Sequence, residues 1–67
     1  MTTVTVNGAA EDVADGTTVP ELVARHRESP RGVAVARHEE VVPRSQWDDT
    51  VAADGDRFEI LTAAQGG

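Results

Sequence analysis

Two stretches near the ends of the chain show the period-two alternation that is typical of half-buried strands. Residues 3–6 read TVTV and residues 57–62 read RFEILT, so apolar side chains recur at alternate positions. The pair Asn7-Gly8 follows the first stretch and favours a type I′ hairpin turn, because both residues tolerate positive φ. We therefore predict strands at both stretches and a return strand at residues 9–13.

One segment carries a helical period instead. Its narrow apolar stripe, at positions i, i+3, i+4 and i+7, consists of Val19, Leu22, Val23 and His26. Thr18 can serve as the N-cap, and Glu21, three residues later, completes a capping box. Pro20 falls in the first turn, where its missing N–H breaks no helical hydrogen bond. We expect one helix at residues 19–27, ended before Pro30, and its single apolar face must lie on a sheet.

The middle of the chain predicts two further strands. Residues 33–36 read VAVA, a continuous apolar run that fits an inner strand. After a turn at residues 38–40, residues 41–42 form a short strand that stops at Pro43. Ser45 is expected to cap a single helical turn.

Together these elements predict an α+β fold, in which a mixed sheet of about four to five strands is packed by one main helix. The first and last strands are expected to lie side by side in the middle of the sheet. We predict a single domain over residues 1–62, followed by a flexible C-terminal tail over residues 63–67.

Composition and charge narrow the classes of function. The 67 residues carry a formal net charge of −6, and all six basic residues are arginines. An acidic surface repels phosphate backbones, which disfavours nucleic-acid binding, and it suits either a partner with a basic face or simple solubility. The sequence has no cysteine, no apolar run long enough to span a membrane and no secretory signal. We therefore expect a cytoplasmic protein that does not bind a membrane.

Residues that could support catalysis are few and scattered. His26 and His38 have no second ligand at metal-binding spacing, so no metal site is expected; His26 is assigned to the helix end and His38 to an exposed turn. The acidic residues of the turn sequences, expected to be solvated, are Asp48, Asp49, Asp54 and Asp56. Trp47 is expected to be a half-buried core aromatic beside the short helical turn, and the alternative is a surface anchor for a partner. Because so small an interior leaves little room for an enclosed site, the protein is not expected to be an enzyme or to bind a cofactor.

The chain ends on Gly66-Gly67, and this end is the candidate working part. Residues 63–67 have small or polar side chains and reach roughly 16 Å when extended, enough to thread a narrow channel in another protein. The α-carboxylate of Gly67 is ionised at neutral pH and is a poor acyl donor. Joining it to AMP creates a leaving group that sulfide or a persulfide can displace. In this interpretation the chain is a protein co-substrate, and catalysis lies in its partners.

The segments VAVARHEEVVPRSQW and DGDRFEI, the helix start TTVPEL and the terminal GG resemble the ThiS family, bacterial sulfur carriers of thiamine biosynthesis. The resemblance covers nearly the whole chain and implies a ubiquitin-like β-grasp fold. It implies that an E1-like (ThiF-like) adenylyltransferase activates Gly67 with ATP and Mg²⁺, and that sulfur from a donor protein converts Gly67 to a thiocarboxylate. A ThiG-like thiazole synthase would then receive the sulfur. Gly66 and Gln65 are predicted to thread into the partner, which would dock on the sheet face near Phe58 and Ile60.

Other uses of the same tail remain open. The small subunit of molybdopterin synthase is also a β-grasp sulfur carrier, although its chain is usually longer and the VVPRSQW segment points away from it. A ubiquitin-like modifier would join its last glycine to a target lysine; this sequence has no lysine, so it cannot form lysine-linked chains of itself. A plain β-grasp binding module with an idle tail is the last alternative.

Overall fold

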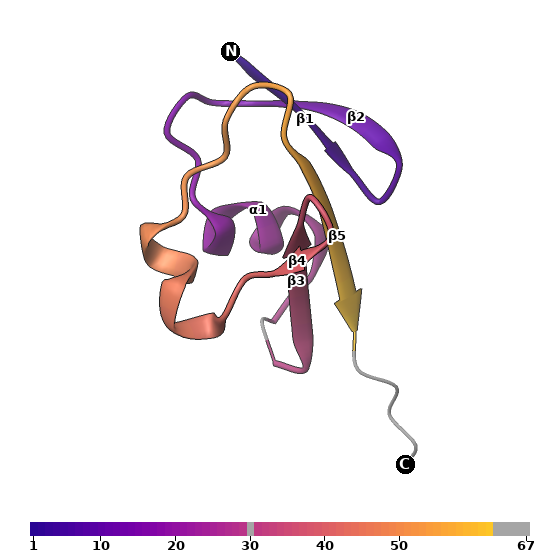
Figure 1. Cartoon of the computed structure of the whole chain (residues 1–67), viewed down its shortest axis with the longest axis vertical. Helices are drawn as coiled ribbons and strands as arrows, with labels where there is room; N and C mark the ends of the chain where they lie inside the picture. Colours follow the sequence, from indigo (N-terminus) through magenta and orange to yellow (C-terminus); the bar gives the residue numbers. More distant parts are fainter. Residues whose placement is uncertain (30, 63–67) are drawn as a thin grey trace.

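The computed structural model, which describes residues 1–29 and 31–62, has one α-helix lying across a mixed five-stranded sheet (Figure 1). The elements are β1 (Thr2–Val6), β2 (Ala9–Val13), α1 (Val19–His26), β3 (Val33–Arg37), β4 (Glu40–Val41) and β5 (Arg57–Thr62). The strand order is β2-β1-β5-β3-β4. β1 and β5 are parallel neighbours in the middle of the sheet, and the other neighbouring strands are antiparallel. The predicted α+β fold, with its mixed sheet and central pair of terminal strands, is confirmed.

The inward-facing residues of the strands and one face of α1 form a shared hydrophobic core. The core residues from the strands are Val4, Val6, Val13, Val33, Val35, Phe58 and Ile60, and those from α1 are Val19, Leu22 and Val23. These positions follow the alternation read in the strands and the stripe read in the helix. Burying an aliphatic or aromatic side chain of this kind stabilises the fold by about 1.5–3 kcal/mol. Shifting the pairing register of a strand by one residue would turn its apolar side chains to solvent. The core therefore fixes the register of the sheet.

The helix begins as its sequence predicts. The Thr18 backbone N–H donates a hydrogen bond to the Glu21 carboxylate at 2.9 Å, which satisfies a donor at the N-terminus that has no partner within the helix. The helix ends at His26, one residue earlier than predicted, and His26 turns away from the core to a carboxylate on β2. Pro30, which was predicted to limit the helix, lies outside the described residues.

Two tight hairpin turns connect each outer strand to its neighbour, β1 to β2 and β3 to β4. Asn7 (φ 51°) and Gly8 (φ 87°) both have the positive φ that a type I′ turn requires, as predicted. The second turn uses His38 (φ 50°) and Glu39 (φ 71°) in the same region, which non-glycine residues enter less readily. Because this turn takes only two residues, the following strand is Glu40–Val41, one position earlier than the predicted residues 41–42.

A 3₁₀-helix, η1 (Arg44–Asp49), replaces the predicted single turn, and it starts directly after Pro43 without a side-chain cap from Ser45. Trp47 on this element was predicted to be a half-buried core aromatic. Its place in the core is confirmed, but it is buried rather than half-buried, with only 3% of its surface exposed. The indole Nε1–H donates to the Val42 carbonyl at 3.0 Å, so the polar edge of the ring can be buried without losing a hydrogen bond.

Within residues 1–29 and 31–62, no helix is long and apolar enough to cross a membrane. The predicted tail, residues 63–67, lies outside the described residues, so the domain boundary before it stays a prediction.

Candidate functional site

The candidate reactive group is the terminal carboxylate of Gly67. Gly67, Gly66 and Gln65 all lie outside the described residues, so their predicted roles stay predictions. The structure does describe the strand that leads to them. β5 runs through the middle of the sheet and ends at Thr62, which is paired with Val33 at the start of β3 (Figure 1).

β5 is held mainly through its inward side chains and its pairing with β3. Phe58 is 0% and Ile60 is 2% exposed, and five residue pairs join β5 to β3. The prediction that Phe58 and Ile60 contact a partner is therefore corrected, because buried side chains have no surface to offer. The alternation of β5 carried this information, since residues 58 and 60 share the core face while residues 57, 59 and 61 point the other way.

The outward face of the sheet carries an apolar patch close to the end of β5. We define the apolar patch as Ala34, Ala36, Val41 and Leu61. Leu61 (56% exposed) is paired with Ala34, and Val41 (72% exposed) is paired with Ala36 one step along β3. Leu61 and Val41 lie on the two strands that flank β3, and an exposed apolar patch of this kind can serve as a contact surface for another protein. The signal was present in the sequence, because Leu61 breaks the apolar-in, polar-out order of β5.

Asp56 lies just before β5 and was predicted to be a solvated turn former; the structure corrects this. Asp56 is 6% exposed, and its carboxylate accepts hydrogen bonds from the Ala53 N–H at 2.9 Å and the His38 Nε2 at 3.0 Å. Arg37 Nε lies 3.5 Å from the same carboxylate. Burial alone would raise the pKa of Asp56, but the Ala53 N–H, the His38 ring and the Arg37 charge together hold that pKa below its ordinary value. Asp56 thus ties the β3–β4 turn to the start of β5.

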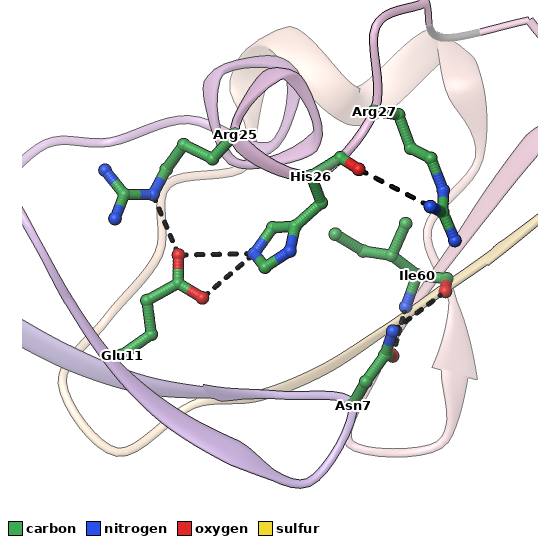
Figure 2. Close-up of polar contacts among 6 residues, drawn as sticks. All are labelled: Asn7, Glu11, Arg25, His26, Arg27 and Ile60. Atoms are coloured by element: carbon green, nitrogen blue, oxygen red, sulfur yellow. Dashed lines mark hydrogen bonds and ion pairs between the residues drawn. The ribbon is translucent and has the colours of Figure 1, made fainter.

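Glu11 on β2 forms a second polar cluster, on the helix side of the sheet (Figure 2). Its carboxylate accepts a hydrogen bond from Arg25 Nε at 2.8 Å and lies 2.9 Å from His26 Nε2. Desolvation would raise the pKa of Glu11, but the hydrogen bonds and charges of Arg25 and His26 lower it overall. The cluster ties the last turn of α1 to the edge strand, which gives it a structural role away from the end of β5.

Neither cluster has the composition of a metal site, and no group of three potential metal-binding residues gathers anywhere in the described chain. A groove of about 320 Å³ lies between α1 and η1, floored by Val23 and Trp47. Its charged lining consists of Arg27, Glu28, Arg44 and Asp48, and neither histidine reaches it. Asp54 is exposed and accepts a hydrogen bond from the Thr3 N–H at 2.8 Å, as expected of a turn residue.

Comparison with known proteins identifies relatives along nearly the full length of the chain. A model of the ThiS family matches residues 4–67, a span that includes the terminal Gly66-Gly67. The sulfur carrier protein ThiS of Escherichia coli (strain K12) is 34% identical over 61 residues, which is 91% of this chain and 92% of that protein. The crystal structure of the thiamine biosynthesis protein ThiS from Geobacter metallireducens superposes with a TM-score of 0.81 at 35% identity, covering 97% of this chain and 99% of that one.

A second kind of relative is much larger. A thiazole synthase of Paramagnetospirillum magneticum is 34% identical over 62 residues, which is 92% of this chain but only 19% of that protein. The chain therefore corresponds to one segment of that synthase.

Proposed function

The chain belongs to the ThiS family, and from this membership we propose that it is a sulfur carrier in thiamine biosynthesis. The observation that carries the proposal is the family match, which runs to the last residue and so includes the terminal glycine pair. The E. coli relative named as a sulfur carrier has nearly the same length and supports the same function. The alternatives of a molybdopterin-type carrier and a protein modifier have no comparable support.

The reactive atom in this proposal is the carboxyl carbon of Gly67. A carboxylate oxygen attacks the α-phosphorus of ATP in the active site of an adenylating enzyme, and pyrophosphate leaves. Sulfide can then attack the acyl carbon and expel AMP, which leaves a thiocarboxylate. With a persulfide donor the product is an acyl disulfide, and a further thiol must reduce it. The chain has no cysteine, so every thiol in this sequence of steps belongs to a partner.

The partners follow from these steps. A ThiF-like adenylyltransferase supplies the site for ATP and Mg²⁺, and a donor protein supplies the sulfur. A ThiG-like thiazole synthase is the acceptor, and the P. magneticum protein supports this pairing because a segment similar to this chain is part of a protein named thiazole synthase. The chain itself acts as a protein co-substrate in each step.

We assign docking of the adenylating enzyme to the apolar patch and no longer to Phe58 and Ile60, which are buried. Leu61 lies six residues before Gly67, so a partner seated on it would have the tail within reach of a channel of roughly 20 Å. Truncating a buried leucine in an interface costs about 1–2 kcal/mol, which corresponds to roughly a 5–30-fold rise in KM. Leu61→Ser is expected to raise the KM of adenylation in this way. Val51→Ser, at an exposed valine outside the patch, is the matched control and should leave KM unchanged.

The test of the function is the intact mass of untagged protein after incubation with the adenylating enzyme, ATP, Mg²⁺ and a sulfur source. A gain equal to one oxygen replaced by sulfur, mapped to Gly67, is the expected result, and a chain lacking Gly67 should show none. An unchanged mass with an enzyme and donor that are active on another carrier would refute the proposal. Formation of the thiazole from the product separates thiamine biosynthesis from other uses of a thiocarboxylate.

A further inference from the structure

Asn7 makes an unusual pair of hydrogen bonds across the sheet. Its side-chain Oδ1 accepts from the Ile60 N–H at 2.8 Å, and its Nδ2 donates to the Ile60 carbonyl at 3.2 Å (Figure 2). Its own backbone N–H donates to the Phe58 carbonyl at 3.0 Å. One residue at the end of β1 therefore bonds to two alternate residues of β5.

These contacts reproduce the next step of a parallel ladder. In such a ladder one residue donates its N–H to one strand position and accepts from the N–H two positions further on. Asn7 makes the first of these bonds with its backbone, but its chain then turns away at φ 51°. The side-chain amide oxygen takes the place of the missing carbonyl and accepts from Ile60. Asn7 thus extends the pairing of β1 with β5, whose backbone register otherwise stops at Val6 and Phe58.

The type I′ turn alone does not explain why residue 7 is asparagine. Aspartate or glycine before Gly8 would form a type I′ turn as well as asparagine does. An amide combines one acceptor and one donor at the spacing of the Ile60 N–H and carbonyl, whereas ionised aspartate offers only acceptors and glycine offers neither. The double contact is therefore a property of asparagine beyond its tolerance of positive φ.

The place of the contact on β5 links it to the chain end. Ile60 is the last core residue of β5, and only Leu61 and Thr62 follow it in the described structure. At this level β5 is held by β3 on one side and by the Asn7 side chain on the other. Any loosening here changes the direction in which the strand leaves the sheet. Leu61 and Thr62 follow Ile60 directly, so such a change moves the point from which residues 63–67 start.

We propose that Asn7 is a positioning residue, which holds the end of β5 so that the terminal carboxylate of Gly67 is presented correctly to the adenylating enzyme. The inference rests on the proposed function and adds to it a residue outside the tail and outside the apolar patch. Leu61 of the patch stays paired with Ala34 of β3 when the Asn7 bonds are lost, so the loss of Asn7 lowers kcat and leaves KM nearly unchanged. Misplacing a reacting group by about 1 Å can cost up to 100-fold in rate, so a fall of roughly tenfold or more in kcat is expected.

The experiment compares Asn7→Gly and Asn7→Asp with the wild-type chain. Both variants keep a residue suited to the turn; the first removes both bonds to Ile60, and the second removes the donor. Gly8→Ala is the control for a weakened turn, because it strains φ 87° in open space and leaves the Asn7 side chain in place. For each untagged protein, kcat and KM are measured from pyrophosphate release by the adenylating enzyme. Amide hydrogen exchange is followed in parallel at Ile60 and along β3.

For Asn7→Gly the expected result is faster exchange at the Ile60 amide, a kcat lower by tenfold or more and a KM within twofold of wild type, while Gly8→Ala keeps its kcat. Asn7→Asp still accepts from the Ile60 N–H but sets a second carboxylate oxygen against the Ile60 carbonyl, so its exchange should rise less and its kcat fall less than in Asn7→Gly. At a pH low enough to protonate the new carboxyl of Asn7→Asp, that group regains a donor, and the protection of Ile60 should return toward wild type at the same pH. Unchanged kcat alongside faster Ile60 exchange would overturn the positioning role. A wild-type chain that is not adenylated at all would instead overturn the proposed function, and this inference with it.

Discussion

Replacing Asp56 by asparagine tests whether the buried cluster before β5 depends on a negative charge. Asp56 accepts hydrogen bonds from the Ala53 N–H and from the ring of His38, with Arg37 nearby. A carboxylate can only accept, so the His38 Nε2 must carry a hydrogen. Asparagine is nearly the same size, and its amide oxygen can still accept from Ala53 on the side of Arg37, but it carries no charge and presents an N–H donor to His38. We expect Asp56→Asn to fold with a clearly lower free energy of unfolding.

The expected loss in the free energy of unfolding is the sum of the losses at the three contacts of Asp56. Changing the Ala53 bond from a charged to a neutral acceptor costs about 1 kcal/mol, and losing the charged bond to His38 costs about the same. Arg37 is 38% exposed and 3.5 Å away, so solvent screening leaves its contribution below about 0.5 kcal/mol. The sum is about 2 kcal/mol, against roughly 3–10 kcal/mol for a typical domain of this size. The melting temperature should fall by about 8–16 °C.

Urea unfolding followed by fluorescence measures this loss, because Trp47 is the single tryptophan and is buried. The pKa of Asp56 is lowered in the folded state from its reference of 3.8, so its contribution is fully present above that value. As the pH falls through the lower, folded-state pKa, the wild-type chain loses this contribution and the gap to Asp56→Asn closes.

The matched control is Asp54→Asn in the same turn, where an exposed carboxylate accepts one bond from the Thr3 N–H. Its loss should stay below about 1 kcal/mol, since an amide oxygen can accept the same bond. A loss under about 0.5 kcal/mol for Asp56→Asn at pH 7 would refute the argument. So would a gap that stays constant down to pH values well below 3.8.

Three further outcomes follow from other parts of the structure. Trp47→Phe leaves the Val42 carbonyl without its 3.0 Å donor and should lower stability by about 2 kcal/mol, measured by circular dichroism because the variant lacks the fluorophore. Glu11→Gln removes the charge that Arg25 and His26 face and should lower the free energy of unfolding by about 1 kcal/mol at pH 7. The difference from the wild-type chain should close as the pH falls below the reference pKa of 4.5, and a difference that stays unchanged at low pH would exclude the charge as its cause. Raising the salt concentration from about 0.1 M to 1 M shortens the Debye length from about 10 Å to 3 Å and should slow association with the adenylating enzyme. An unchanged association rate would exclude electrostatic steering by the net charge of −6.

The elements of the fold could be predicted because their signals are local. The alternation of residues 3–6 and 57–62, the stripe of α1 and the Asn7-Gly8 turn each depend on residues within a few positions of one another. The errors occurred where distant residues decide the outcome. Trp47 is buried because η1 packs against α1, an element that ends well before it in the chain, and no pattern local to residues 44–49 indicates this contact.

The polar clusters were missed for the same reason. Asp56 stands in a DGD sequence that is typical of an exposed turn, and its burial depends on His38, eighteen positions earlier. The contact from Asn7 to Ile60 spans 53 positions and joins two strands whose pairing is parallel, so it emerges only once the sheet is assembled. Alternation along β5 did hold enough information to place Phe58 and Ile60 inside, and assigning them to a docking face gave too little weight to that pattern.

The inward side chains, the outward side chains and the backbone of β5 each serve a different requirement of a carrier: a stable fold, docking to a partner and presentation of the tail. Its inward residues bind the core, its outward Leu61 belongs to the apolar patch, and its backbone at Ile60 is held by Asn7. A strand can do this because successive side chains point to opposite faces while the hydrogen-bonding groups lie in the plane between them. Substitutions in the three directions should therefore change different quantities: inward ones the free energy of unfolding, outward ones KM, and those at Asn7 kcat. If outward and edge substitutions instead changed KM and kcat together, docking and presentation of the tail would be a single event, and the separation argued from the strand would not hold.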